Sequence, residues 1–231
     1  MENAKISSLF DLSQTIAASI FEGATYPWEV LCKIKSYILE LSTKLDSSVY
    51  EQRGENIWIA KSATIYPNAN IYGPCIIGEE TEVRPGAFIR GNAIVGNHCV
   101  VGNSTELKNV ILFNNVQVPH YNYVGDSILG YKSHMGAGSI TSNVKSDKTL
   151  VVVKRKVYDE NGEVVSTEEI PTGLKKFGAM LGDNVEVGCN SVLNPGTVVG
   201  RASNIYPTSC VRGVIPPNSI LKKDGKAYTK H

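Results

Sequence analysis

A strict six-residue spacing of large aliphatic side chains runs through the middle of the sequence. The spacing holds without a break at nine positions, which are Ile59, Ile65, Ile71, Ile77, Val83, Ile89, Val95, Val101 and Leu107. Mostly small residues, such as Ala63, Cys75 and Thr81, stand four places after these aliphatic residues. A fixed period of this length is typical of a parallel β-helix, in which each hexapeptide forms a short strand and a turn. We expect the aliphatic side chains to fill the interior and the small residues to fit its crowded corners.

The same period returns further along the chain, on both sides of an interruption. It slips near residues 109–112, resumes at Leu112, and reappears as a second block at Leu181, Val187, Leu193, Val199, Ile205 and Val211. Between the blocks, two alternating β-rich runs flank Asn161 and Gly162, a dipeptide that strongly favours a β-hairpin turn. We therefore predict a β-hairpin arm over about residues 148–177. Because a two-stranded arm is only marginally stable alone, it should lie on a neighbouring subunit or cover a cleft.

The first 47 residues lack the repeat and show helical periodicity instead. One helical face carries Leu9, Leu12, Ile16 and Ile20, and a second, after Pro27, carries Val30, Leu31, Ile34, Ile38 and Leu41. We predict two short amphipathic helices that cap the first coil, because the open end of a β-helix exposes unpaired strand edges. A contact with a partner or another subunit is the alternative. The predicted architecture is all-β, with a helical N-terminal cap over residues 1–47 and a parallel β-helix domain with its arm over residues 48–231.

The composition adds little charge and no targeting signal to this picture. The chain has 231 residues, a formal net charge of +1 and 19% charged residues, with no basic stripe or acidic tail. No nucleic-acid or anionic-membrane partner is therefore indicated. The sequence starts without a basic leader and contains no apolar stretch long enough to span a bilayer. Its five cysteines form no CxxC motif, so we expect reduced thiols in a cytoplasmic protein.

Outward-facing polar residues gather between residues 84 and 176. His120 stands at the third place of its hexapeptide, so its ring should point outward, where a neutral imidazole can act as a general base. A solvent-exposed loop histidine is the equally simple alternative. Arg84 and Lys108 suit an anion such as a phosphate, or they belong to a solvated face with Glu106 as an ion partner. Tyr123 is placed either to orient a substrate hydroxyl or to pack between coils.

An ordered set of short motifs runs through the same section. The motifs are RPGA at 84–87, ELK at 106–108, HYNYVGD at 120–126, GAGSITSN at 136–143, KKFG at 175–178 and LGDNVEVG at 181–188. Together they resemble the C-terminal acetyltransferase domain of the bifunctional glucosamine-1-phosphate acetyltransferase / N-acetylglucosamine-1-phosphate uridyltransferase enzymes. This resemblance implies a left-handed β-helix that works as a homotrimer, with acetyl-CoA and an amino sugar bound between adjacent prisms. No Gly-rich nucleotide loop precedes the repeats, so the resemblance is to a short relative without the uridyltransferase activity.

The resemblance also implies a role for each matching side chain. His120 corresponds to the catalytic base, and Asn143 to a catalytic amide that orients the amino sugar and the histidine. The sugar and its phosphate would be held by Arg84, Glu106, Lys108, Tyr123, His134 and Lys176. Acetyl-CoA would be bound near Ala137, Gly138, Cys189 and Pro207. Three positions depart from the family, since Val144 replaces a tyrosine, His134 an asparagine and Cys189 a serine.

These features predict an acyl-CoA-dependent N-acetyltransferase acting on an amino-sugar phosphate or a nucleotide-linked amino sugar. Acetyl-CoA would be a co-substrate, and neither a tightly bound cofactor nor a metal is expected. The alternative is a non-catalytic trimer that binds a sugar nucleotide or scaffolds a separate nucleotidyltransferase, with the N-terminal helices as its docking element. A third interpretation is a metallo-hydratase of the γ-carbonic-anhydrase type. The three internal histidines, His98, His120 and His134, occupy different places in their hexapeptides, which separates them and disfavours a shared metal.

Overall fold

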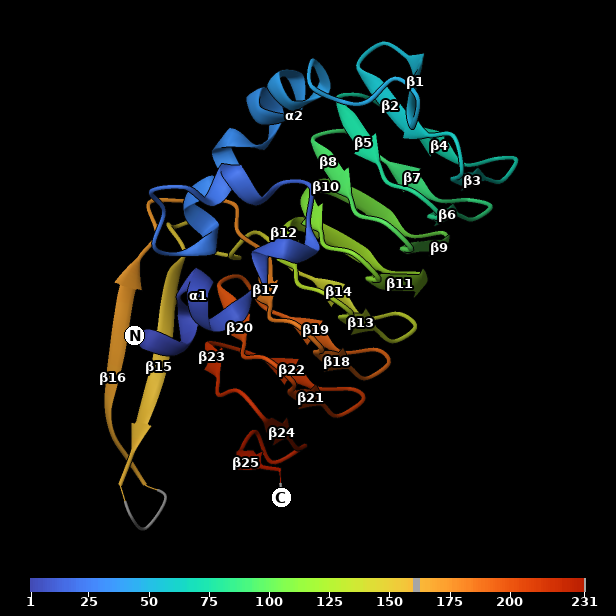
Figure 1. The fold of residues 1–231 in the computed structure, drawn as a ribbon. Helices are drawn as coiled ribbons and strands as arrows, with labels where there is room; N and C mark the ends of the chain where they lie inside the picture. The colour runs from blue at the N-terminus through green and yellow to red at the C-terminus, as the bar shows by residue number, and fades with distance from the viewer. Residues whose placement is uncertain (160–162, 231) are drawn as a thin grey trace.

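The chain winds into a three-sided prism, a left-handed parallel β-helix, in the computed structural model (Figure 1). The structure describes residues 1–159 and 163–230. Most coils take 18 or 17 residues, as the parallel pairs Ile57 with Cys75 and Val110 with Ser127 illustrate. Each coil adds one short strand to each of three faces, so the predicted fold class is confirmed.

The three faces are named in the order in which the chain visits them. The first face contains β2 (Ile57–Ala60), β5 (Cys75–Ile77), β8 (Ala93–Val95), the second halves of β10 (Glu106–Leu112) and β12 (Tyr123–Leu129), β17 (Ala179–Leu181), β20 (Thr197–Val199) and β23 (Val214–Ile215). The second face contains β3 (Thr64–Ile65), β6 (Glu82–Val83), β9 (Val100–Asn103), β11 (Gln117–His120), β13 (His134–Met135), β18 (Glu186–Val187), β21 (Asn204–Ile205) and β24 (Ser219–Leu221). The third face contains β4 (Asn70–Ile71), β7 (Phe88–Ile89), the first halves of β10 and β12, β14 (Ile140–Thr141), β19 (Val192–Leu193) and β22 (Cys210–Val211).

The interior of the prism confirms the six-residue pattern. Inward aliphatic side chains such as Ile77, Val83 and Leu107 are completely buried. Cys75 and Cys99 occupy the small corner positions, and burial raises the pKa of each thiol to about 12. Both cysteines therefore serve packing, as their places in the repeat predicted.

The N-terminal segment lies along the flank of the prism and not over its end, so the predicted capping of the first coil is wrong (Figure 1). The segment comprises η1 (Glu2–Ala4), α1 (Ile6–Leu9), η2 (Leu12–Gln14), η3 (Ala18–Phe21), η4 (Pro27–Lys33) and α2 (Ile34–Ser42). The N–H of Asp183 donates to the Leu9 carbonyl and that of Asn114 to the Gln14 carbonyl, at 3.0 and 2.9 Å. Further along, α2 packs on β5, β8 and β10. Antiparallel strands close the ends of the prism instead, with β1 (Tyr50–Gly54) on β2 and β25 (Ala227–Thr229) on β24.

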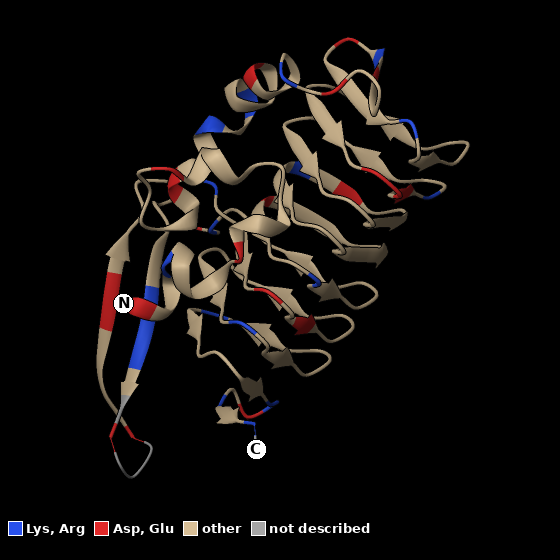
Figure 2. Ribbon diagram, in the orientation of Figure 1, with Lys and Arg blue, Asp and Glu red and all other residues tan. Residues whose placement is uncertain are grey.

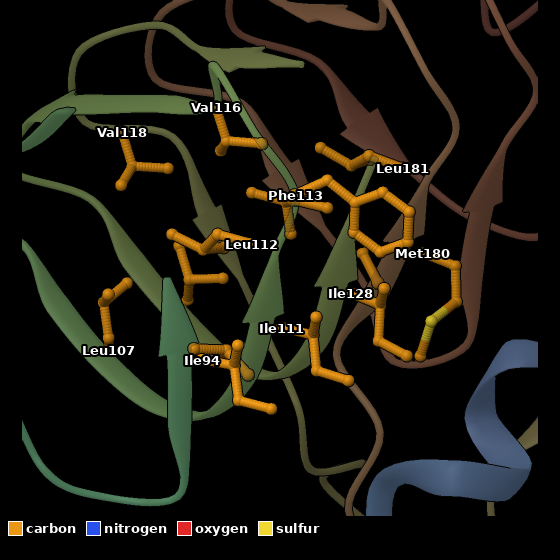
Figure 3. Close-up of a cluster of buried hydrophobic side chains, with 14 of the residues drawn as sticks. Ile94, Leu107, Ile111, Leu112, Phe113, Val116, Val118, Ile128, Met180 and Leu181 are labelled. Carbon is orange, nitrogen blue, oxygen red and sulfur yellow. The ribbon is translucent and has the colours of Figure 1, made fainter. Parts of the chain in front are cut away.

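The reason for this placement is an apolar stripe on the outside of the first face. Side chains alternate along a strand, so the middle residue of each first-face strand from β5 to β20 points outward. These middle residues are apolar and 0% exposed, and they are Ile76, Ile94, Ile111, Ile128, Met180 and Val198. Figure 3 shows Ile94, Ile111, Ile128 and Met180 in a row. The N-terminal segment covers the upper part of this stripe and buries most of its own apolar side chains there, although Ile16 and Leu39 stay exposed.

The N-terminal segment is also less helical than predicted. The first expected helix, around residues 9–20, is divided into short turns. The Asp11 side chain accepts a hydrogen bond from the Ser13 N–H and starts a new turn, while the Leu9 and Gln14 carbonyls bond to the prism. The second expected helix is present as η4 and α2, and Pro27 stands at its start.

The predicted hairpin arm is present and packs on its own prism. It consists of β15 (Val152–Tyr158) and β16 (Val164–Pro171), which pair antiparallel; the predicted turn at Asn161 and Gly162 lies outside the described residues. Val151 and Val153 are fully buried at its base, and β15 contacts β23. The base of the arm thus packs on the lower part of the first face, whereas most of β16 is exposed, and the expected contact with a neighbouring subunit stays a prediction. Lys154 pairs with Glu169 and Arg155 with Glu168 across its strands, and Figure 2 shows these facing basic and acidic stretches.

No helix in the part of the chain that the structure describes combines the length and the apolar character needed to cross a membrane.

Candidate functional site

One edge of the prism, between the second and third faces, carries the predicted base and the predicted acetyl-CoA positions. Backbone hydrogen bonds connect the coils along this edge, from Gly138 N–H to the His120 carbonyl, from Asn190 N–H to the Ala137 carbonyl and from Thr208 N–H to the Cys189 carbonyl, at 2.8–3.0 Å. The coil above contributes Asn103, which pairs with His120. We call this column, formed by Asn103, His120, Ala137, Cys189 and Pro207, the His120 edge. The Gly138 N–H is therefore already bonded within the protein.

His120 ends strand β11 with an exposed side chain, which confirms its predicted outward position. Its backbone N–H donates to Oδ1 of the buried Asn122 at 3.1 Å. Asn122 Nδ2 in turn donates to the Gly136 and Ser139 carbonyls of the next coil, at 2.9 and 3.0 Å. The turn that carries the imidazole is therefore fixed to the coil below. On the coil above, Asn103 Oδ1 is buried and has no hydrogen-bond partner within the described chain.

A shallow groove of about 480 Å³ lies on the second face beside the His120 edge. Its lining includes His134, Glu186, Cys189, Tyr206 and Pro207. Gly136 and Gly188 leave its floor without side chains; a Cβ on Gly188 would approach the Pro207 nitrogen to 2.4 Å. His134 Nδ1 lies 2.8 Å from Glu186 Oε2. The structure therefore groups His134 with the predicted acetyl-CoA residues and not with the sugar-binding residues.

A second group of polar side chains lies on the third face. Glu106 and Tyr123 are neighbours in the parallel ladder of β10 and β12, and Arg90 Nη1 contacts Glu106 Oε1 at 2.6 Å. Asn143 Nδ2 donates to Tyr123 Oη at 3.2 Å. Lys108 pairs in register with Gly125 on the coil below. We call these residues, Arg90, Glu106, Lys108, Tyr123 and Asn143, the Tyr123 cluster.

Burial and nearby negative charges keep the Tyr123 phenol protonated, and Gly125 leaves room for its ring. The ring extends along the strand over Gly125, where a Cβ would lie 2.4 Å from Tyr123 Oη. Burial, followed by the negative charges of Asp126 and Glu106, raises the pKa of Tyr123 above its usual value of 10.0. The phenol therefore stays protonated at neutral pH and can donate a hydrogen bond to a ligand.

The inserted arm brings Lys176 back to Asn143. The insertion closes where the Phe177 N–H donates to the Asn143 carbonyl at 2.9 Å, which fixes the exposed Lys176 beside the Tyr123 cluster. Val144, at the start of the insertion, is 42% exposed. Lys176, predicted to hold the sugar phosphate, and Asn143, predicted to orient the amino sugar, are thus near one another along the backbone.

Arg84 lies apart from the Tyr123 cluster. It follows β6 on the second face, where its Nε contacts Glu82 Oε2 at 3.1 Å. Arg90, and not Arg84, lies on the coil directly above Lys108, since the Arg90 N–H donates to the Leu107 carbonyl. The signal was in the spacing, because Arg90 precedes Lys108 by 18 residues, one coil, whereas Arg84 precedes it by 24, a coil and a third.

His120 and Asn143 occupy opposite edges of the third face. His120 precedes the third-face strand of its own coil, and Asn143 follows β14, the third-face strand of the coil below. Within one chain, the structure does not bring the predicted base and the predicted catalytic amide together.

The three internal histidines are also separate. His98 stands in a turn with φ of 55°, and His134 pairs with Glu186, whereas His120 is at the end of β11. Within residues 1–159 and 163–230, no three or more His, Cys, Asp or Glu side chains gather as metal ligands would. The geometry therefore gives no support to the carbonic-anhydrase interpretation.

Sequence comparisons relate the chain to known proteins. A family profile described as the GMPPB C-terminal domain matches residues 71–224. The bifunctional protein GlmU of Methanococcus maripaludis is 34% identical over 208 residues, which cover 89% of this chain and 48% of the relative. A bifunctional sugar-1-phosphate nucleotidylyltransferase/acetyltransferase of Sulfurisphaera tokodaii is 31% identical over 185 residues, covering 72% of this chain and 42% of the relative. These matches confirm the resemblance seen in the motifs, and the chain spans about half the length of the curated relatives it matches.

Solved structures resemble the chain more loosely. The acetyltransferase domain of PglB from Neisseria gonorrhoeae, in complex with acetyl coenzyme A, aligns with a TM-score of 0.35 and 15% identity over 76% of this chain and 58% of that one. A likeness of this size carries no argument about function.

Proposed function

Because the chain belongs to the GMPPB C-terminal domain family, we propose that it transfers an acetyl group from acetyl-CoA to the amine of an amino-sugar phosphate or a nucleotide-linked amino sugar. The observation that carries the proposal is the His120 edge, where an exposed imidazole stands in one column with three positions assigned to acetyl-CoA. A relative named as a bifunctional sugar-1-phosphate nucleotidylyltransferase/acetyltransferase supports the same class of substrate.

The donor half of the reaction uses the groove beside the His120 edge. An extended acetyl-CoA would run along the prism through this groove, over the bare backbone of Gly136 and Gly188, with its thioester near His120. The exposed Cys189 and Pro207 would line its path. Holding the thioester next to the base converts a bimolecular encounter into a positioned reaction, which is a large part of the barrier reduction in such transfers.

His120 serves as the general base in this proposal. Its neutral imidazole takes a proton from the acceptor amine as the nitrogen bonds to the thioester carbonyl carbon. The tetrahedral intermediate then expels the thiolate of coenzyme A, which recovers the proton from the imidazolium. Asn103 Oδ1, buried and unpartnered within the described chain, offers an acceptor to the other ring nitrogen and would fix its tautomer.

The acceptor half uses the Tyr123 cluster. Arg90, Lys108 and Lys176 supply the positive charge that a sugar phosphate or a diphosphate requires. The Glu106 carboxylate neutralises Arg90 in the free protein and is available to a sugar hydroxyl or amine when a phosphate takes its place. Tyr123 and Asn143 complete the polar contacts.

A homotrimer would join the two halves. Since His120 and Asn143 stand at opposite edges of the third face, we infer that the His120 edge of one prism faces the Tyr123 cluster of the next. Mixed trimers of His120→Ala and Asn143→Ala chains should then be more active than the reduced activity of either variant alone, because some sites combine two intact halves. Failure of the mixture to exceed its components would remove the inter-chain site.

The activity itself is tested by measuring free thiol from acetyl-CoA with a panel of amino-sugar phosphates and nucleotide-linked amino sugars. We expect thiol release with at least one acceptor that carries both an amine and a phosphate, and none with the N-acetylated product. If no member of the panel releases thiol, the proposed function is wrong.

A further inference from the structure

A buried carboxylate lies behind the Tyr123 cluster, and neither the motifs nor the comparisons gave it a role. Asp126 ends the third-face half of β12, and it is 6% exposed. Two asparagine side chains donate to its carboxylate, Asn143 Nδ2 to Oδ2 at 2.6 Å and Asn109 Nδ2 to Oδ1 at 2.9 Å. The Asp126 carbonyl accepts from the Gly178 N–H at 2.9 Å, next to where the arm rejoins the prism.

These contacts fix which way the Asn143 amide faces. An ionised carboxylate only accepts hydrogen bonds, so the side of Asn143 that touches Asp126 must be its NH₂ group. That group also donates to Tyr123 Oη at 3.2 Å, so both of its N–H bonds are used. Asn143 Oδ1 is left as the free end of the amide, and it can only accept.

The same contacts fix the polarity of Tyr123. Its oxygen accepts from Asn143, and its raised pKa keeps the phenol protonated, so the O–H remains for a ligand. The cluster therefore presents an obligate acceptor, Asn143 Oδ1, beside a donor, the Tyr123 hydroxyl. An amine that must point its lone pair at a thioester needs an acceptor for its N–H, and a sugar or phosphate oxygen needs a donor.

We propose that Asp126 is a positioning residue that sets the Asn143 amide as the hydrogen-bond acceptor for the amino sugar. This inference rests on the proposed function, and it adds the residue that determines which group at the acceptor site accepts a hydrogen bond and which donates one. Asp126 touches no substrate; it acts through Asn143, and through Asn143 on Tyr123.

Asp126→Asn is the sharpest substitution. It keeps the shape of the side chain but replaces one acceptor oxygen with an NH₂ group, so only one of the two asparagine donors still meets an acceptor. The Asn143 amide then no longer has a fixed orientation. We expect kcat/KM for the amino-sugar acceptor to fall about tenfold to hundredfold, the range for loss of one hydrogen bond to a charged group. The KM for acetyl-CoA should stay unchanged, because the groove lies on another face.

Asn109→Gly is the matched control. It removes the other donor to Asp126 together with the contact from Asn109 Nδ2 to the Leu31 carbonyl at 3.3 Å, and it leaves Asn143 untouched. Glycine also suits the Asn109 backbone, whose φ is 55°. This variant should lower the melting temperature without changing the kinetics of the acceptor. Equal kinetic losses in both variants would show a purely structural role for Asp126.

A double-mutant cycle tests the route of the effect. In an Asn143→Ala background, Asp126→Asn should cost no further activity if it acts through Asn143. Additive losses would overturn the proposal.

A readout that needs no turnover separates this inference from the proposed function. With ¹⁵N-labelled asparagine, the side-chain amide protons of Asn143 should exchange slowly with solvent in the wild-type protein and rapidly in Asp126→Asn. Fast exchange in the wild type would overturn the role of Asp126 even if acetyl transfer is found. Slow exchange with no acetyl transfer to any acceptor would instead reject the proposed function alone.

Discussion

The first and second faces of the prism share one hexapeptide frame and differ in a single position of it. The outward middle residue of a first-face strand is apolar and fully buried, as at Ile76, Ile94 and Ile111. On the second face the corresponding position is mostly polar and is exposed, as at Gln117, or half-buried, as at His134. Packing of the interior does not constrain this outward position, so its residue type depends on what contacts the outside of each face. The first face is covered by the N-terminal segment and the arm, which stabilises the fold, whereas the second face is uncovered and carries the groove.

The largest expected effect on stability comes from placing a charge on the covered first face. Ile111→Asp buries an unpaired carboxylate beneath α2 and should cost about 3–5 kcal/mol of unfolding free energy, enough to unfold a marginal variant. Gln117→Asp makes the matched change at the outward position of the second face, and should stay within about 0.5 kcal/mol of the wild type. Urea denaturation of both variants measures the difference. Similar losses on the two faces would break the comparison.

A smaller effect separates two arginines that each pair with a glutamate. Arg90→Ala removes a cation from the Tyr123 cluster, and should raise the KM for a phosphorylated acceptor about tenfold. Arg84→Ala removes an equivalent ion pair with Glu82 on the second face and should change that KM less than about twofold. Steady-state kinetics at saturating acetyl-CoA distinguishes them. A large effect at Arg84 with none at Arg90 would favour the assignment made from the RPGA motif.

The smallest expected effect is on the pH dependence of stability, and it concerns the hydrogen bonds of Asp183 between the N-terminal segment and the prism. Asp183 is 4% exposed and accepts from the Asp11 and Tyr131 N–H groups at 2.7 and 2.9 Å, and burial raises its pKa above 3.8. In the window from 3.8 up to that raised pKa, the folded state binds more protons than the unfolded state, so stability falls as the pH rises.

Asp183→Asn removes this titrating group. The unfolding free energy of the wild type should therefore fall towards that of the less stable variant as the pH rises through the same window. Unfolding free energies measured at a series of pH values test the slope. A difference that widens with rising pH would mean that the contacts with Asp11, Tyr131 and Arg201 lower the pKa more than burial raises it.

Much of the fold could be predicted because one interaction, the packing of the interior, repeats along the chain. The spacing from Ile59 to Leu107 determined the strands, and the break in it located the arm. The six-residue period did not predict the place of the N-terminal segment, because the period reports the inward residues and not the apolar residue beside them, such as Ile94.

The site was predicted less completely, because it depends on which face each residue reaches. Counting in steps of 18 would have grouped Arg90 with Lys108 and separated both from Arg84. His120 was found because its place in the repeat points outward. Asp126 lies 17 residues, one coil, from both Asn109 and Asn143, so the same counting would have aligned the three residues, but it could not show that both amides donate to a buried carboxylate.

The central claim is that acetyl transfer takes place at the His120 edge. The most direct test compares His120→Ala with the wild type in two measurements on the same sample, binding of acetyl-CoA by calorimetry and release of free thiol with the active acceptor. The account predicts an unchanged dissociation constant for acetyl-CoA and a turnover reduced by about 10²–10⁴-fold, the usual contribution of a general base. A variant that turns over at the wild-type rate would contradict it.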